Sequence, residues 1–159
     1  MTDIGWGHLA QVEAYGRLGD AAEDYKIIRY SDSIENYKSY MKAAHAMIFA
    51  HDDQILWELY KAKAAVLMQM RFDGVLGFPG GLVEDDETPL QGINRELEEE
   101  INLDLDKYSL CDDDHVVVFC NDQKKLILHF YAKEVSLEDF KSIEMAVLSA
   151  PDYGNEVCT

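Results

Sequence analysis

Three glutamates near the middle of the chain, Glu96, Glu99 and Glu100, have the spacing of side chains on one edge of a helix. At roughly 100° per residue they fall within an arc of roughly 100°, whereas Glu98 lies on the opposite side. Like charges this close cost on the order of 0.2–0.5 kcal/mol per pair, so we expect a cation to compensate them. Mg²⁺ and Mn²⁺ take oxygen ligands, and Mg²⁺ commonly shares them with substrate phosphates. The spacing therefore predicts a divalent metal site that acts on phosphates.

The helix that must carry these glutamates has a start signal in Thr88-Pro89-Leu90-Gln91. Thr88 can cap the free amides, Pro89 suits the first helical position, and Gln91 completes a capping box. Arg95 can pair with Glu99 one turn later and orient its carboxylate. The apolar residues recur at three- and four-residue steps that keep one stripe on a core: Leu90, Ile93, Leu97 and Ile101.

A turn is predicted before this helix at Phe78-Pro79-Gly80-Gly81, where two glycines let the main chain approach a ligand. A backbone carbonyl at Gly80 can then join the metal shell. The residues from Leu82 to Thr88 would form the loop that returns to the helix. Asn102 ends the pattern where a left-handed residue is often needed, and asparagine tolerates that conformation.

Short apolar or alternating runs elsewhere in the chain predict strands. Ser136 opens a second predicted helix, which continues the pattern after the last strand. Mixed strands with a helix before and after them favour an α/β fold, an α/β/α sandwich in which one helix covers each side of a mixed sheet. The predicted strands are Ala43–Ala50, Ala64–Met70, Val75–Leu82, His115–Cys120 and Leu126–Val135.

Charge is concentrated around the predicted metal site. The formal net charge is −17, and residues 84–106 carry ten acidic side chains against Arg95. Without metal, such a protein should repel polyanions, so a bound cation is expected to serve substrate binding as well as chemistry. The basic residues are scattered, with Lys124-Lys125 the only adjacent pair, which argues against a dedicated nucleic-acid binder.

The remaining composition indicates a single domain of 159 residues with no linker or internal repeat. No apolar run approaches the length of a membrane span, and residues 1–30 lack the pattern of a secretory signal, so we expect an intracellular protein with no membrane partner. Cys111, Cys120 and Cys158 are odd in number without CxxC spacing, so we interpret them as free thiols.

The complete block, GLVEDDETPLQGINRELEEEINL, resembles the Nudix hydrolase signature, with Asn102 in place of its last glycine. Together with LMQMRFDGVLGFPGG, LHFYAKE and DYGNEV, it is similar to one branch, that of the nucleolar snoRNA-decapping enzyme that is also an inosine diphosphatase. The resemblance covers about residues 43–157. It implies a Nudix α/β/α fold, Mg²⁺ or Mn²⁺, a homodimer, and a place in the nucleus, nucleolus and cytoplasm.

The resemblance also implies roles for individual residues. Glu96, Glu99 and Glu100, with Arg95, would form the catalytic group. The three glutamates, the Gly80 carbonyl and Glu156 would bind the metal. The residues that would hold the substrate are His45, Arg71, Phe78, Gly80 and Leu82, of which Leu82 replaces an aromatic residue and would weaken stacking on the base.

Domain bounds follow from the same comparison. Residues 1–42 would be an N-terminal extension, partly helical or disordered, and residues 43–159 the Nudix domain. Relatives of this branch continue beyond the match to Glu156 through a further strand and a terminal helix. We therefore expect the domain to lack that strand and helix, and its base pocket and dimer contacts to be affected.

Three functions are consistent with these features. The sequence favours hydrolysis of a purine nucleoside diphosphate, such as inosine diphosphate, by a metal-activated water whose proton a carboxylate accepts. Removal of the cap from a small nucleolar or messenger RNA is the alternative within the same chemistry. A non-catalytic Nudix domain that binds metal or a protein partner is the alternative from another class.

Overall fold

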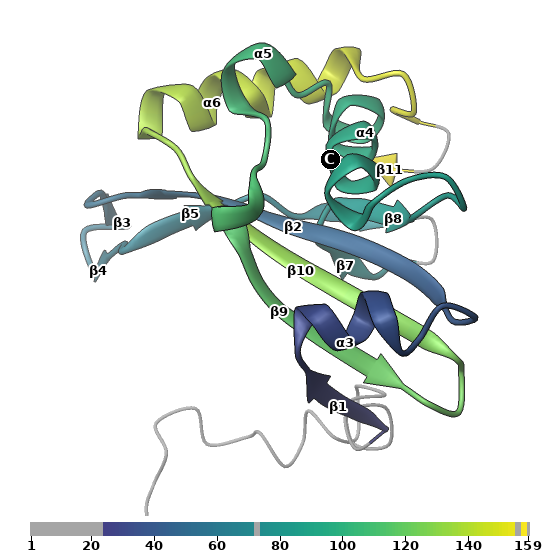
Figure 1. The fold of residues 1–159 in the computed structure, drawn as a ribbon. Coiled ribbons are helices and arrows are strands. Elements are labelled where there is room, and N and C mark those ends of the chain that lie inside the picture. The colour runs from purple at the N-terminus through teal and green to yellow at the C-terminus, as the bar shows by residue number, and fades with distance from the viewer. Residues whose placement is uncertain (1–23, 72–73, 155–156, 159) are drawn as a thin grey trace, which may run out of the picture.

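A computed structural model describes residues 24–71, 74–154 and 157–158 (Figure 1). The helices are α3 (Tyr30–Glu35), α4 (Pro89–Ile101), α5 (Leu105–Tyr108) and α6 (Leu137–Ala146), with short 3-10 turns η1 (Asp112–Asp114) and η2 (Val147–Ser149). The strands are β1 (Tyr25–Ile28), β2 (Met41–His51), β3 (Ile55–Leu56), β4 (Tyr60–Lys61), β5 (Ala64–Val66), β6 (Gln69–Arg71), β7 (Leu76–Gly77), β8 (Gly80–Leu82), β9 (His115–Asn121), β10 (Leu126–Glu134) and β11 (Val157–Cys158).

The main sheet has the strand order β1-β9-β10-β2-β5, and β8 pairs with the first half of β2. β10 and β2 run parallel, whereas the other pairs in this sheet are antiparallel. The mixed sheet and the α/β class predicted from the sequence are thus confirmed. Strand β8 places Gly81 beside Ala44 and Gly80 beside His45, which brings the predicted turn against the centre of the sheet.

One face of this sheet forms the core. Alternate residues of β2, from Ala44 to Ala50, are fully buried there, and so is Tyr131 of β10. Leu97 of α4 and Ile143 of α6 belong to the same buried cluster, so both helices cover this face. Burial of the apolar stripe of α4 stabilises the fold by roughly 1.5–3 kcal/mol for each large aliphatic side chain, and it fixes the rotation of the helix about its axis.

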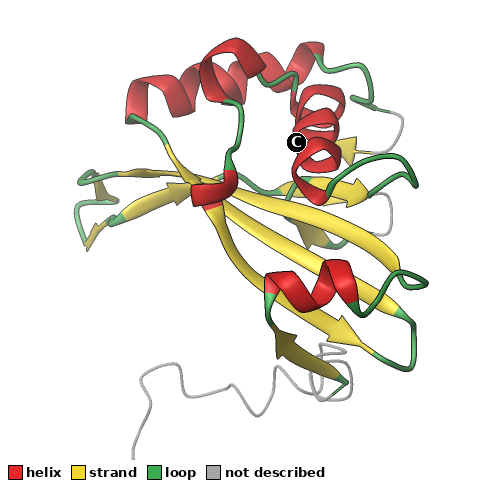
Figure 2. Ribbon diagram, in the orientation of Figure 1, coloured by secondary structure: helices red, strands yellow, loops and turns green. Residues whose placement is uncertain are grey.

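All the helices in the described residues that pack on the main sheet share that face (Figure 2). Helix α3 lies there because the Tyr30 ring contacts His129, which alternates with Tyr131 on the core side of β10. The sequence predicted one helix on each side. The opposite face instead carries half-buried side chains such as His45 and Phe130, neighbours in the parallel register of β2 and β10.

The N-terminal region contributes directly to this sheet within the described residues. Strand β1 pairs antiparallel with β9, with Tyr25 beside Asn121. Helix α3 follows β1 and precedes β2, and the extension predicted over residues 1–42 stays a prediction. Residues 1–23 lie outside the described residues. None of the described helices is long and apolar enough to cross a membrane.

The predicted strands are found with modified limits. The runs at residues 43–50, 115–120 and 126–135 correspond to β2, β9 and β10. The runs at 64–70 and 75–82 are each divided in two. Pro79 explains the second division, since it has no N–H to donate, and its carbonyl instead accepts from the Ala46 amide at 2.9 Å.

Candidate active site

The turn before α4 requires a glycine at position 80. Gly80 has φ +131°, and a Cβ there would lie 2.2 Å from the Ala44 carbonyl oxygen. A Cβ on Gly81 would lie 2.7 Å from a carboxylate oxygen of Glu96, so a side chain there would displace that carboxylate. The chain therefore passes β2 at Gly80 at a distance that only glycine permits.

Helix α4 begins and ends as its sequence predicts. The Gln91 amide donates to the Thr88 hydroxyl at 3.2 Å, and the Thr88 amide donates to the Gln91 side chain at 2.9 Å, which completes the capping box. Asn102 closes the helix in the left-handed conformation, with φ 50° and ψ 43°. These caps satisfy groups that a helix leaves free at its ends, and they hold the glutamates on a well-defined helix.

Glu100 links this helix to the glycine turn. Its side chain is buried, and one carboxylate oxygen accepts a hydrogen bond from the Gly80 amide at 2.6 Å. Glu98 is exposed, as expected from its place on the opposite side of the helix. The predicted edge of three carboxylates is thus present, with Glu96 against Gly81 and Glu99 half-buried.

Arg95 joins the carboxylates of this edge to Glu87 in the preceding loop. Its guanidinium donates to Glu87 at 2.8 and 3.2 Å, to Glu96 at 3.0 Å and to Glu99 at 2.9 Å. It also donates to the Leu82 carbonyl at 3.1 Å. The expected pair with Glu99 is confirmed. The role of Glu87 follows from these contacts.

The electrostatics of this group leave a surplus of negative charge. Arg95 lowers the pKa of the Glu87 carboxyl, and Glu87, followed by Glu99 and Glu96, raises the pKa of the guanidinium. A single guanidinium therefore faces three carboxylates, and Glu100 lies next to them. A hard divalent cation with oxygen ligands is the compensation that this composition suits.

The described residues fit a metal only with rearrangement or additional ligands. Within residues 24–71, 74–154 and 157–158, no three acidic, histidine or cysteine side chains converge as a ready metal site. Arg95 contacts Glu96 and Glu99 with the same Nη1 atom, so it stands between two of the carboxylates that would bind the ion. Glu156, predicted as a further metal ligand, lies outside the described residues.

The residues predicted to hold the substrate lie near the same turn. His45 pairs with Gly80 across β2 and β8, on the open face of the sheet. The Phe78 ring packs edge-on against Phe130, with 5.2 Å between the ring centres. Phe130 was not among the predicted site residues, although the alternation in Leu126–Glu134 would have placed it on the face of His45.

Arg71 and Leu82 occupy two different edges of this region. The backbone of Arg71 pairs with that of Val157, so β11 lies beside β6. Leu82 pairs with Ala43 at the end of β8 and its side chain is 60% exposed. The glycine turn thus gathers Gly80, His45 and Leu82 along one strand pair, and their roles toward a substrate stay predictions.

Comparison with known proteins gives a consistent family match. Residues 42–159 match the model of the family described as Nudt16-like: U8 snoRNA-decapping enzyme-like. The chain is 46% identical over 155 residues to a U8 snoRNA-decapping enzyme of Homalodisca vitripennis, covering 98% of this chain and 83% of that protein. It is 35% identical over 136 residues to the enzyme of the same name from Mus musculus, covering 85% of this chain and 70% of that protein.

Two further likenesses extend this comparison. A Tudor-interacting repair regulator protein of Gallus gallus is 37% identical over 117 residues, which cover 72% of this chain and 36% of that protein. Among solved structures, a mutT/nudix family protein from Listeria innocua has 20% identity and a TM-score of 0.49, covering 74% of this chain and 76% of that one.

Proposed function

The chain belongs to the Nudt16-like family of U8 snoRNA-decapping enzyme-like Nudix hydrolases, and on this premise we propose that it removes the cap of an RNA by hydrolysing a phosphoanhydride bond. The observation that carries the proposal is the α4 edge, where Glu96 and the buried Glu100 lie against the glycine turn and Glu99 is held by Arg95. In this reaction a water oxygen forms one P–O bond as the bridging P–O bond breaks, and each fragment leaves with a phosphate end.

The protein groups have distinct tasks in this proposal. Mg²⁺ or Mn²⁺ held by Glu96, Glu99 and Glu100 would neutralise the bridging phosphates and lower the pKa of the attacking water. Gly80 fixes Glu100 before substrate binds, whereas Arg95 would have to release Glu96 or Glu99 as the ion binds. Glu96 and Glu156 are the candidates for the base that accepts the proton, and Gly80 and Glu156 would complete the ligand set.

Capped RNA takes precedence over inosine diphosphate among the substrates. The sequence alone favoured the small nucleotide, because basic residues are scattered in a chain of net charge −17. The family description and the relatives with 46% and 35% identity described above are named for decapping. Hydrolysis of inosine diphosphate stays a second proposal, supported by the aromatic pair Phe78–Phe130 beside His45, which suits a purine ring.

A non-catalytic role is the competing proposal. The relative named as a repair regulator shows that similar chains include proteins named for an interaction. The carboxylate edge of this chain is complete and its turn glycines are retained, which supports catalysis. Homodimer formation and a nuclear site of action are further proposals that rest on the family.

One assay separates these functions. The purified chain is incubated with a capped oligoribonucleotide and, separately, with inosine diphosphate, with and without Mg²⁺ or Mn²⁺. We expect metal-dependent release of the capped fragment. Turnover of inosine diphosphate alone would favour the second proposal, and metal binding without turnover of either substrate would favour the non-catalytic role.

A further inference from the structure

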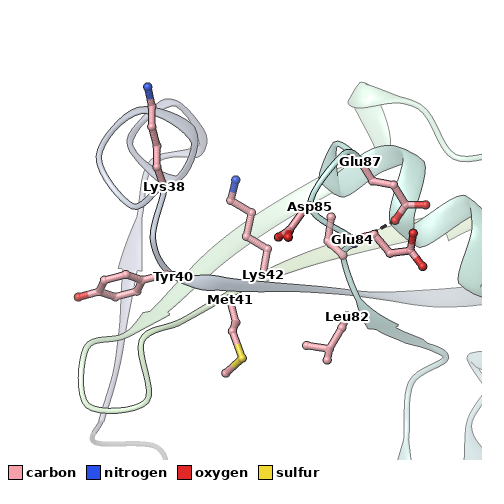
Figure 3. A pocket seen from close by; sticks show the side chains of 9 residues that line it. Lys38, Tyr40, Met41, Lys42, Leu82, Glu84, Asp85 and Glu87 are labelled. Carbon is pink, nitrogen blue, oxygen red and sulfur yellow. Dashed lines mark hydrogen bonds between the residues drawn. The ribbon is translucent and has the colours of Figure 1, made fainter.

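A pocket lies directly beyond the glycine turn, at the start of β2. It has a volume of about 180 Å³ and is formed by Lys38 and residues 40–42 on one side and by residues 82–85 and Glu87 on the other (Figure 3). Its rim contains two basic side chains, Lys38 and Lys42, and the carboxylates of Glu84, Asp85 and Glu87. The pocket adjoins the catalytic group through Glu87, which Arg95 binds at 2.8 Å.

The two lysines are the distinctive feature of this pocket. Lys38 is exposed and Lys42 half-buried, and within the described part of the chain neither makes a salt bridge. The positive charge of Lys42 acts instead on His129, whose pKa it helps to lower. Two cations without carboxylate partners in so acidic a chain are available for an external anion.

The position of the pocket relative to the predicted substrate residues defines what it can hold. Along β2, Lys42 lies two residues before Ala44 and shares its face of the sheet, whereas the side chain of His45 points to the opposite face. Gly81 pairs with Ala44, and Glu96 lies against Gly81. A substrate whose phosphates lie at the glutamates of α4 would therefore pass Lys42 on the face that α4 covers.

The polar groups of the pocket suit a ribonucleotide. Figure 3 shows the Lys42 ammonium and Asp85 carboxylate on one side of β2 and the Met41 and Leu82 side chains on the other. Lysines bind phosphate oxygens, and carboxylates accept from ribose 2′-hydroxyls, so one nucleotide can contact both kinds of group on the Lys42 side. The volume is below the roughly 300–1,000 Å³ of pockets that enclose a whole ligand, so it suits one unit of a chain that continues into solvent.

From this arrangement we propose that the pocket binds the first nucleotide of the RNA chain on the far side of the hydrolysed bond, with Lys38 and Lys42 on its phosphate. The inference rests on the proposed decapping function and adds a basis for substrate choice. Inosine diphosphate has no such extension, so these lysines would select capped RNA over the small nucleotide.

The test compares Lys38→Gln, Lys42→Gln and the double variant with wild type on both substrates in Mg²⁺. Lys141→Gln is the matched control, since Lys141 is an exposed lysine of α6 away from the pocket. We expect kcat/KM for capped RNA to fall by roughly 3- to 10-fold for each pocket lysine that is replaced. The slope of log kcat/KM against log salt concentration should become shallower by about 0.7 for each RNA phosphate that the variant no longer binds. Turnover of inosine diphosphate should stay unchanged.

Equal losses on both substrates, or no loss on RNA, would overturn the inference while leaving the decapping proposal intact. A wild-type chain that cleaves no capped RNA would contradict the decapping proposal instead. In that case fluorescence anisotropy of the uncleaved capped oligoribonucleotide decides the inference. Weaker binding by the Lys38→Gln and Lys42→Gln variants than by Lys141→Gln supports the inference. Equal binding by all of these variants, or no binding by wild type, rejects it.

Discussion

The buried carboxylate of Glu100 accepts a hydrogen bond of 2.6 Å from the backbone amide of Gly80, twenty residues earlier in the chain. This contact joins the end of α4 to the strand that pairs with β2. Glu100 is therefore a structural residue as well as a candidate metal ligand, which separates it from the more exposed Glu99.

We expect Glu100→Ala to lower the free energy of unfolding by about 1–3 kcal/mol, because it leaves the Gly80 amide without this acceptor. Glu100→Gln keeps a carbonyl oxygen and should cost less, yet it should lose turnover to a similar degree. Urea unfolding and the decapping assay measure the two effects. Equal stability of the two variants would contradict the assignment of this hydrogen bond.

Gly80→Ala should be the more damaging of two glycine substitutions. The new Cβ would meet the Ala44 carbonyl at 2.2 Å in a backbone with φ +131°, so we expect a loss of about 3 kcal/mol or more from strain and overpacking together. Gly74→Ala is the control, since Gly74 has φ +75° but open space around its Cβ position. That variant should lose only about 1 kcal/mol. Thermal unfolding of both variants measures the difference, and equal losses would mean that the close approach to Ala44 is relieved.

The buried histidine of β10 predicts a loss of stability in acid. Burial, followed by the charges of His115 and Lys42, lowers the pKa of His129 to about 4. The Tyr30 ring contacts His129, and the Tyr131 ring contacts His115. Burial lowers the pKa of His115 as well, and Asp112 opposes this shift. In the unfolded chain His129 takes up a proton near pH 6.5, whereas in the folded chain it stays neutral until about pH 4. Its neutral form therefore contributes fully to the free energy of unfolding above pH 6.5, and that contribution is lost as pH falls from about 6.5 through 4.

The shift in the pKa of His129 corresponds to a loss on the order of 3 kcal/mol in the free energy of unfolding between pH 7 and pH 4. Urea unfolding at pH 7, 5.5 and 4.5 in wild type and His129→Phe measures it, and the variant should lose much of the pH dependence. His51→Gln is the control, because the His51 side chain is 76% exposed. An unchanged pH dependence in His129→Phe would count against this origin of the acid sensitivity.

Local patterns account for what could be predicted from the sequence. The caps and apolar stripe of α4 lie within one continuous segment, so the edge of three glutamates follows from helical periodicity alone. The contact of Arg95 with Glu99 is also local, one turn along the helix. The fold class could be predicted because the longest strands, β2, β9 and β10, are apolar or alternating runs of ordinary length.

Non-local pairing accounts for what could not. Strand β1 exists because Tyr25 pairs with Asn121, and no pattern within YKII indicates that partner. The two-residue strands β3 and β4 are too short for any periodicity. Lys42 lines the pocket at the start of β2 only because the chain after Leu82 lies beside it, where the Val83 amide donates to the Lys42 carbonyl.

Asn102 is the one position of the glutamate block where the chain departs from the family pattern, and its left-handed φ of 50° explains why the departure is tolerated. Asn102→Gly should keep or slightly raise the free energy of unfolding, since glycine adopts this conformation without a Cβ penalty. Asn102→Ala should lower it by about 1 kcal/mol. Thermal unfolding distinguishes the two, and a stability order with alanine above glycine would contradict the proposed cap.

Glu99 offers the sharpest test of the catalytic edge, because its side chain is 42% exposed and contributes little to packing. We expect Glu99→Gln to lower kcat by at least about 100-fold, the usual scale for loss of a group that acts in proton transfer or metal binding, with a thermal midpoint close to that of wild type. Glu98→Gln removes the same charge from the opposite side of α4 and should retain near wild-type turnover. If both variants lost activity equally, the net charge of the helix would matter and the position of the carboxylate would not. Near wild-type turnover by Glu99→Gln would remove Glu99 from the active site.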